Sequence, residues 1–281
     1  MSETVGAVSV WDHLNKVLEF RYRANLPKVS IILPTYNDAQ ALSSTLQSVW
    51  EQKYPDYELI VIDAGSTDRT LEIVDSFRTD NLRVFSAAHF NRYKMWNQGA
   101  SLARGRYLSF LYPGASYLWC YSLAYMMNLA LQHSEPSIVY SGSMMRSGDG
   151  EASILFRRYD DEQLSKGLQP TALASCWFRA DTFGLLRGFS EVYPVRGSLD
   201  LLCRALHSPG ARAVATSRVL TDHTPYSDSQ ARILQHAFDT WRLVARHYGR
   251  QKAIRWLLSQ QDLGRLAGLW WRSLRTAFLG R

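Results

Sequence analysis

Two short polar turns carry the side chains best suited to hold a ligand. The first is "LPTYNDA", with Asp38 near its end, and the second is "IDAGSTDRT", with Asp63 at its start. A carboxylate fixed at a strand end by backbone amides can bind one polar edge of a ligand, because charge-assisted hydrogen bonds are short and directional. The alternative is an ordinary turn in which Ser66 and Asp68 cap the next helix. Two such turns at this spacing favour a ligand site.

Buried strands followed by helices must position these turns. "VSIILP" (29–34) and "YELIVIDAG" (57–65) begin as continuous apolar runs, which are typical of strands buried on both faces. The segment after the first run has helical periodicity, with Leu42, Leu46 and Val49 on one face. The alternation predicts βαβ units and a mostly parallel sheet with right-handed crossovers. Ligands of such sheets bind beyond the carboxyl ends of the strands, where both turns lie.

The next elements continue this pattern. "LRVFSA" predicts a short third strand, "RYKMWNQGASLARG" a helix closed by Gly105, and "RYLSFLY" a fourth strand. Residues 107–134 carry no charge and are long enough to span a bilayer. Pro113 and Gly114 interrupt them, which favours a buried strand followed by a buried helix. The polar stretch 141–170 predicts a hairpin or loop region.

Composition sets broad limits on the protein. A chain of 281 residues with 46% hydrophobic residues can bury a large core in one domain with appendages. The three widely spaced cysteines predict a reducing compartment, without a zinc site or a disulfide framework. The N-terminus shows no secretory signal pattern. Residues 250–281 hold seven basic residues and one acid, so that they account for +6 of the net charge of +7. This local charge argues against a broad nucleic-acid-binding face.

The two turns and their strands resemble the N-terminal half of family 2 glycosyltransferases, which have the GT-A fold. The resemblance extends over roughly residues 29–205 and is strongest at its start. "NRYKMWNQGASLARGRYLSFL" is similar to the family's next helix and strand, and "QPTALASCWFRADTFGLLRGFSE" to its acceptor-side segment. The resemblance implies an α/β fold with a mixed, mostly parallel sheet flanked by helices. It also implies an inverting transfer of a sugar from a nucleotide-diphosphate sugar to a glycan or lipid-linked acceptor.

The resemblance further implies which residues form the site. A nucleotide of UDP type would lie at the two turns, with Asp63 bound to the base. The other nucleotide-binding candidates are Pro34, Thr35, Tyr36, Asp38, Gly65, Ser66 and Asp68. The family's general base comes from the turn matched by "VRGSLDLL", where Asp200 is the candidate. A structural acid near a helix end is the alternative for Asp200, because general-base catalysis requires geometry as well as a carboxylate.

The stretch "LYPGA" departs from the family pattern. Relatives carry an acidic motif there, Asp-x-Asp or a near variant, which holds a divalent cation against the diphosphate. Gly114 and Ala115 stand in its place, so Mg²⁺ or Mn²⁺ would lack its usual ligands. Arg92 and Lys94, with His223 as a weaker third candidate, would then neutralise the diphosphate or the sugar-phosphate bond. Alternatively, Arg92 and Lys94 face solvent, as most such side chains do.

The chain is predicted to divide into an N-terminal amphipathic helix (1–26), a GT-A domain (27–225) and a helical, basic, amphipathic C-terminal segment (226–281). One helical stripe of that last segment is apolar and consists of Trp256, Leu263, Leu266, Trp270, Leu274 and Ala277. Tryptophan on one face and arginine on the other favour binding to an anionic membrane surface through residues 250–281. The alternative is packing on the domain or on a partner subunit. Membrane binding would place a peripheral protein at the cytoplasmic face of the cell membrane, in polysaccharide or lipopolysaccharide biosynthesis.

Two functions remain open from the sequence. The first is a hexosyltransferase-type enzyme whose transfer is metal-independent. The second is a catalytically degenerate GT-A domain that binds a nucleotide-sugar or a partner protein. The missing acidic motif is the feature that keeps the second alternative open.

Overall fold

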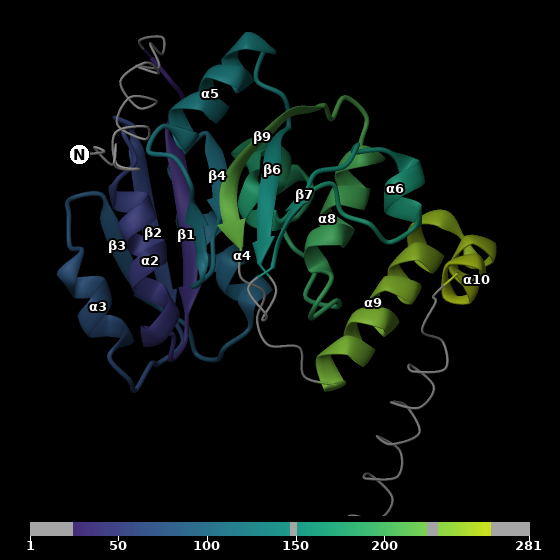
Figure 1. Ribbon diagram of the computed structural model, residues 1–281, viewed down its shortest axis with the longest axis horizontal. Coiled ribbons are helices and arrows are strands. Elements are labelled where there is room, and N and C mark those ends of the chain that lie inside the picture. The colour runs from purple at the N-terminus through teal and green to yellow at the C-terminus, as the bar shows by residue number, and fades with distance from the viewer. Residues whose placement is uncertain (1–24, 147–150, 224–229, 260–281) are drawn as a thin grey trace, which may run out of the picture.

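The computed structural model describes residues 25–146, 151–223 and 230–259. Its centre is a nine-stranded mixed sheet with the order β3-β2-β1-β4-β8-β6-β9-β5, and β7 pairs with β6 (Figure 1). The strands are β1 (Val29–Thr35), β2 (Tyr57–Asp63), β3 (Leu82–Ser86), β4 (Tyr107–Phe110), β5 (Ala115–Tyr117), β6 (Ile138–Arg146), β7 (Ala152–Leu155), β8 (Cys176–Arg179) and β9 (Ala213–His223). The helices are α2 (Ala39–Trp50), α3 (Thr70–Ser76), α4 (Arg92–Leu102), α5 (Ser122–Gln132), α6 (Asp161–Ser165), α7 (Ala180–Leu185), α8 (Gly197–Leu206), α9 (Gln230–Tyr248) and α10 (Arg250–Leu258), with a 3-10 turn η1 (Leu173–Ser175).

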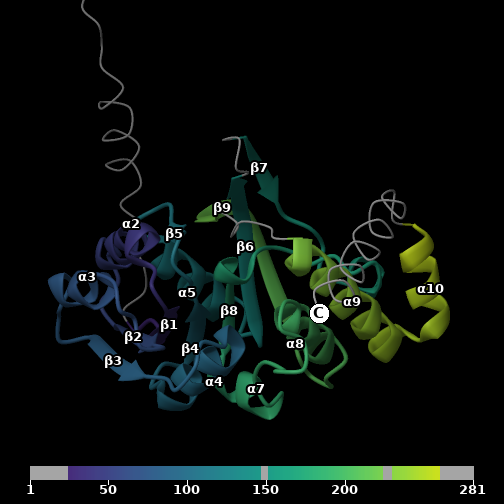
Figure 2. The same cartoon turned by 90° about the horizontal axis from the view of Figure 1, so that it is seen from below.

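The N-terminal half of the sheet is parallel, as its sequence predicts. β1 lies between β2 and β4, and β3 extends the parallel pairing beyond β2. Every residue of β1 is buried, which explains its continuous apolar run. α2 and α4 lie on opposite faces of these strands (Figure 2). The predicted face of α2, formed by Leu42, Leu46 and Val49, is buried.

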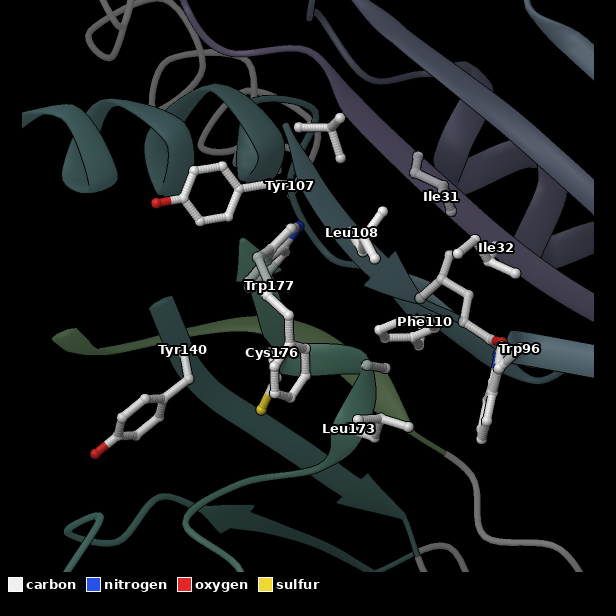
Figure 3. Packing of buried hydrophobic residues seen from close by; sticks show 14 of the residues in the cluster. Ile31, Ile32, Trp96, Tyr107, Leu108, Phe110, Tyr140, Leu173, Cys176 and Trp177 are labelled. Carbon is white, nitrogen blue, oxygen red and sulfur yellow. The ribbon is translucent and has the colours of Figure 1, made fainter. Parts of the chain in front are cut away.

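The core continues from the parallel strands into the antiparallel part of the sheet. β8 runs antiparallel to both β4 and β6. Figure 3 shows Phe110 near Ile32 and Trp96, with Trp177 on the neighbouring strand. Trp177 is fully buried, and the ring of Phe110 meets that of Phe189 edge-on at 4.8 Å between centroids. This aromatic core ties the two halves of the sheet into one body.

The uncharged stretch 107–134 forms β4, β5 and α5, which confirms the predicted buried strand followed by a buried helix. In the part of the chain that the structure describes, no helix is long and apolar enough to cross a bilayer. β6 and β7 form an antiparallel pair, in agreement with the hairpin predicted within 141–170.

α4 ends at Leu102, three residues before the predicted closing glycine. The amide of Arg104 donates to Glu58 Oε1, and the amide of Gly105 donates to Ser30 Oγ at 2.8 Å. A Cβ at position 105 would lie 2.4 Å from the backbone nitrogen of Ser30. Gly105 therefore serves a close approach to β1 and does not cap the helix.

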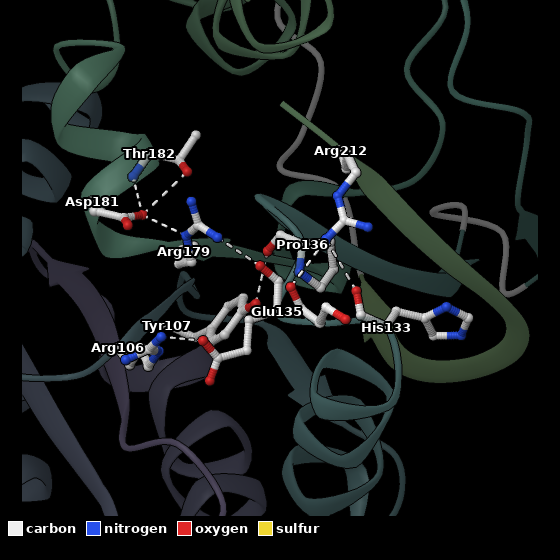
Figure 4. A network of polar contacts seen from close by, with 10 residues as sticks. Arg106, Tyr107, His133, Glu135, Pro136, Arg179, Asp181, Thr182 and Arg212 are labelled. Atoms are coloured by element: carbon white, nitrogen blue, oxygen red, sulfur yellow. Dashed lines mark hydrogen bonds and ion pairs between the residues drawn. The ribbon is translucent and has the colours of Figure 1, made fainter. Parts of the chain in front are cut away.

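A polar network anchors the turn between α5 and β6 (Figure 4). Arg179 on β8 donates to the carbonyl of Glu135 at 2.7 Å, and the hydroxyl of Tyr107 donates to the carbonyl of Pro136 at 2.7 Å. Arg212, just before β9, donates to the carbonyl of Ser134 at 3.0 Å. Burial raises the pKa of Tyr107, so this hydroxyl stays protonated and keeps donating. The network connects β4, β8 and β9 at the end of the sheet remote from the two polar turns.

The C-terminal helices pack against the domain. The carboxylate of Asp239 on α9 accepts a hydrogen bond at 3.0 Å from the amide of Val195. On α10, Ala253 is buried and Trp256 is half-buried, with its indole beside Gly167. The predicted helix 1–26, apart from residues 25 and 26, and the rest of the apolar stripe lie outside the described residues. The single stripe residue that is described, Trp256, thus lies against the domain.

Candidate active site

The two polar turns lie side by side because β1 and β2 pair in parallel, with Thr35 opposite Asp63. Both oxygens of the Asp63 carboxylate have partners within the protein. Oδ1 accepts from the hydroxyls of Thr35 (2.8 Å) and Ser66 (2.6 Å), and Oδ2 from the amides of Gly65 (2.9 Å) and Ser66 (2.8 Å). Asp63 is only 5% exposed. It therefore acts as a positioning residue that shapes the turn, and the structure gives no support to its predicted contact with a base.

The first turn is joined to the second by hydrogen bonds. Asn37 adopts a left-handed conformation (φ 52°), and its Oδ1 accepts from the amide of Thr67 at 2.8 Å. Asp68 accepts from the amides of Ala39 (3.2 Å) and Thr70 (3.0 Å). A hydrogen bond from Thr70 holds the pKa of Asp68 below its ordinary value. Asp38 caps its own turn by accepting from the amide of Tyr36 at 2.9 Å. Capping and ligand binding, the two interpretations of these acids, are thus compatible, and the capping is what the structure shows.

Replacing Asp63 with alanine is expected to destabilise the protein. The substitution leaves two amides and two hydroxyls without their acceptor, and a buried donor left without a partner costs about 1–3 kcal/mol. Urea denaturation measures the change in the free energy of unfolding. Asp75→Ala is the matched control, because it removes an exposed acid of α3 that pairs with Arg78. Its free energy of unfolding should stay within about 0.5 kcal/mol of the wild type. Equal stabilities of the two variants would contradict the positioning role.

An exposed aromatic pair forms the rim above the turns. Tyr36 is 44% exposed and Phe90 is 45% exposed, and their ring centroids lie 5.7 Å apart. The other candidates here are placed differently: Pro34 and Thr35 are buried within β1, whereas Gly65, with φ 81°, is exposed at the turn. The accessible features of this rim are therefore aromatic faces and backbone groups. Phe90 is not among the site residues predicted from the sequence.

Phe90 also borders a cleft with a volume of about 570 Å³. Its walls come from the start of α4, the end of β4, the β6–β7 hairpin, the segments 169–173 and 194–198, the end of β9, and α9. The lining residues are Phe90, Asn91, Arg92, Tyr93, Trp96, Tyr112, Met145, Leu155, Gln169, Ala172, Leu173, Pro194, Val195, Ser198, His223 and His236. None of these described lining residues carries a carboxylate. Their basic side chains are those of Arg92, His223 and His236.

The structure separates the two basic residues of α4. Asn91 caps the helix by accepting from the amide of Lys94 at 3.0 Å, and Arg92 follows on the cleft side. The Arg92 guanidinium carbon lies 5.4 Å from the centre of the Tyr112 ring and 5.8 Å from that of Trp96. Aromatic faces attract a guanidinium and limit where it points. Lys94 is exposed and does not line the cleft, so its predicted role beside Arg92 has no structural support.

The turn "LYPGA" brings His223 into the cleft. Gly114 has φ 92°, and its amide donates to Thr45 Oγ1 at 3.0 Å. Ala115 is fully buried and pairs with His223 across β5 and β9. His223 Nε2 lies 3.1 Å from the hydroxyl of Tyr112. The position of the expected acidic motif is therefore occupied by backbone and small side chains, with a histidine–tyrosine pair beside it.

These residues do not fit a divalent cation held by carboxylates. Within residues 25–146, 151–223 and 230–259, no group of three or more His, Cys, Asp or Glu side chains is arranged to hold a metal ion. Hard cations such as Mg²⁺ require oxygen ligands, which the lining of the cleft offers mainly as amide and hydroxyl groups.

Sequence comparisons show the family of the chain. The sequence profile described as Glycosyl transferase family 2 matches residues 30–111. PGL/p-HBAD biosynthesis glycosyltransferases of Mycobacterium bovis and Mycobacterium tuberculosis are 30% identical over 193 residues, which cover 65% of this chain and 71% of theirs. The chain belongs to glycosyl transferase family 2. Another member, glycosyltransferase AglE of Haloferax volcanii, is 39% identical over 93 residues, 31% of each chain.

Solved structures of other glycosyltransferases share the fold. Staphylococcus aureus TarS, residues 1–349 in complex with UDP, has a TM-score of 0.62 at 19% identity over 80% of this chain and 68% of TarS. The mannosyltransferase PcManGT from Pyrobaculum calidifontis, in complex with GDP-Man and Mn²⁺, has a TM-score of 0.58 at 18% identity over 96% of this chain and 88% of its own. The mixed, mostly parallel sheet flanked by helices is thus the GT-A fold that the sequence resemblance implies.

In this family 2 glycosyltransferase, the structure gives no support to the predicted role of Asp200 as the general base. Its carboxylate is 2% exposed and faces α9, away from the cleft lining. Oδ2 accepts from Arg204 Nε at 2.7 Å, and Oδ1 pairs with His247 Nε2 at 2.9 Å. Burial alone would raise the pKa of Asp200, but the hydrogen bond from His247 and the charge of Arg204 lower it overall. Asp200 is therefore a structural acid that joins α8 to α9.

The same turn presents Ser198 to the cleft instead. Ser198 Oγ accepts from Gln169 Nε2 at 2.6 Å, and its amide donates to the hydroxyl of Tyr93 at 3.2 Å. The Tyr93 hydroxyl in turn donates to the carbonyl of Val195 at 3.0 Å. The glycosyltransferase thus has a polar cluster of Tyr93, Gln169 and Ser198 in the cleft lining, made by residues that were not among the predicted site residues. His236 on α9 was also missed, because α9 follows the segment that carries the resemblance.

Proposed function

We propose that this glycosyltransferase transfers a sugar, with inversion at the anomeric carbon, from a nucleoside-diphosphate sugar to a glycan or lipid-linked acceptor. Its transfer would be metal-independent. The observation that carries the proposal is the cleft of about 570 Å³, which combines Arg92, His223 and His236 with no carboxylate among its described lining residues. An inverting transfer needs one in-line displacement, in which the acceptor oxygen attacks as the nucleoside diphosphate leaves.

The donor nucleotide would bind at the ends of β1 and β2. The exposed ring of Tyr36 can stack on a base, and its contact with Phe90 continues this surface into the cleft. Asp63, Ser66, Asp38 and Asp68 hold the two turns in place, as described above. Complexes of TarS with UDP and UDP-GlcNAc support a donor of UDP type for this fold, while PcManGT binds GDP-Man.

Arg92 would neutralise the diphosphate that leaves. A guanidinium keeps its charge at all relevant pH values and offers a fork of N–H donors that matches phosphate oxygens. Tyr112 and Trp96 flank its guanidinium, so its orientation is set before the donor binds. His223, next to the turn that lacks the acidic motif, lies on the same side of the cleft. Cationic side chains placed where charge develops stabilise the transition state as a bound cation does.

The proposal is tested by measuring nucleotide release from a panel of UDP-, GDP- and dTDP-sugars in the presence of glycan and lipid-linked acceptors. We expect turnover with one donor class and equal rates with and without EDTA. Strict dependence on Mn²⁺ or Mg²⁺ would overturn metal independence. Nucleotide binding by calorimetry without turnover on any donor would overturn transfer and favour a domain that only binds.

Attachment to a membrane would bring the enzyme to a lipid-linked acceptor at the cytoplasmic face. On α10, Arg250, Lys252 and Arg255 accompany exposed apolar side chains. Ile254 is 55% exposed and Leu258 is 69% exposed. An apolar face with basic neighbours binds at the interface of an anionic membrane. The proposal therefore places the contact on α10 and the residues after it.

The full chain is expected to sediment with vesicles that contain anionic lipid, and a chain ended at Ser259 is expected to bind them less. Both proteins should show the same thermal unfolding, because α9 and α10 are kept. High salt should weaken the binding of the full chain without abolishing it, since screening acts on the charges and leaves the apolar contact. No sedimentation of the full chain at low salt would contradict the membrane assignment.

A further inference from the structure

The cleft must contain a group that accepts the proton of the acceptor hydroxyl, and Asp200 is turned away from it. Tyr93 is ruled out because its hydroxyl already donates to the Val195 carbonyl and accepts from the Ser198 amide. Ser198 and Gln169 are bonded to each other, and neither gains a proton near neutral pH. Among the lining residues that the structure describes, the side chains able to accept a proton near neutrality are His223 and His236.

The two histidines come from different elements, His223 from β9 and His236 from α9. His223 ends β9, pairs with Ala115 and contacts Tyr112, so it lies beside Arg92 on the side assigned to the diphosphate. His236 comes from α9, which is fixed against the segment 194–198 by Asp239 one turn further along. Asp239 is fully buried and accepts from the amide of Val195 at 3.0 Å. α9 therefore holds His236 on the wall formed by Val195 and Ser198.

We propose that His236 is the general base of the transfer. In this reaction the acceptor oxygen forms a bond to the anomeric carbon, and the bond from that carbon to the β-phosphate oxygen breaks. The electron pair of the broken bond leaves with the nucleoside diphosphate, and the acceptor proton moves to an imidazole nitrogen of His236. No further reactant is needed. This inference rests on the proposed function, since it names the base of that same reaction.

Charge placement supports this division of roles. The titratable and charged groups that share the cleft with His236 are Arg92 and Tyr93 from α4, Tyr112 after β4, and His223 from β9. Arg92 and His223 lie together with Tyr112, where negative charge develops on the leaving diphosphate. A base must be neutral before the reaction and becomes cationic during it, which suits a histidine on α9, an element that carries neither Arg92 nor His223.

The test compares steady-state kinetics of the wild type, His236→Ala, His236→Gln and His223→Asn, on whichever donor the wild type uses. Both His236 variants should lose about 100-fold or more in kcat, as expected for removal of a general base. Donor affinity measured by calorimetry should stay within about twofold, and imidazole in the buffer should restore part of the activity of His236→Ala. The acidic limb of the kcat/KM profile should disappear in His236→Gln and persist in His223→Asn. His133→Gln, at an exposed position after α5, is the control and should match the wild type.

Each other outcome overturns the inference in a distinguishable way. Retention of activity in His236→Gln shows that another group takes the proton, and the transfer itself still stands. Weakened donor binding in that variant places His236 at the donor. Loss of the acidic limb in His223→Asn assigns the base to β9. A wild type that binds nucleotide but turns over no donor removes the proposed function, and this inference with it. Thermal unfolding of His236→Gln identifies a loss of activity that comes from misfolding.

Discussion

Arg92→Ala should lower kcat by about 100-fold or more, the loss typical of removing one preorganised group that stabilises transition-state charge. Arg92 is the arginine of the described cleft lining, and its guanidinium is flanked by the rings of Tyr112 and Trp96. The expected loss is large because none of the described lining residues carries a carboxylate that could hold a cation in place of this charge. The measurement is kcat and KM on the preferred donor, with and without EDTA.

Lys94→Ala is the matched control, because Lys94 lies in the same helical turn, has the same charge and is exposed outside the cleft. Its rate should stay within about threefold of the wild type, which corresponds to about 0.7 kcal/mol. Arg92→Lys should recover only part of the activity, since a point charge replaces a planar fork of donors. Equal losses of kcat in Arg92→Ala and Lys94→Ala would show that both side chains act only through the long-range electrostatic field of the protein. The assigned contact of Arg92 with the diphosphate would then be wrong.

Asp200→Ala should lower the free energy of unfolding by about 3–5 kcal/mol, the range for breaking a buried ion pair from one side. The substitution leaves Arg204 and His247, between α8 and α9, without the carboxylate that both contact. Urea denaturation gives the change, because its midpoint shifts in proportion to stability. Asp161→Ala breaks a more exposed pair with His207 and should cost less than about 1 kcal/mol.

The stability contributed by Asp200 should also depend on pH. The folded protein holds the pKa of this carboxyl below its ordinary value of about 4. A lowered pKa stabilises the folded state above the ordinary value, and this contribution is lost as the pH falls through the lower folded-state value. The difference in stability between wild type and Asp200→Ala should therefore be full at pH 6–7 and shrink below about pH 4. A difference that stays constant down to pH 3 would contradict the ionised, paired state of Asp200.

The parallel strands, the first helices and the two adjacent polar turns could be predicted from the sequence. β1 and β2 are continuous apolar runs because helices cover both faces of the sheet, and each run ends in a polar turn. The regular alternation of strand and helix leaves few topologies, and the paired turns resemble one family strongly. The sequence alone also determines that Gly114 and Ala115 can hold no cation through their side chains in any fold.

The roles of single residues depended on tertiary structure. Arg92 and Lys94 are two positions apart, so they point to different sides of α4, and only the packing of Tyr112 and Trp96 shows which one enters the cleft. Asp200 matches the position of a catalytic acid, yet its carboxylate is hydrogen-bonded to His247, 47 residues later, and to Arg204. His236 lies on α9. The hydrogen bond from the Val195 amide to the buried Asp239 carboxylate holds this helix against a segment that lines the cleft. Spacing along the chain sets which face of an element a side chain occupies, whereas contacts between distant elements decide what that face meets.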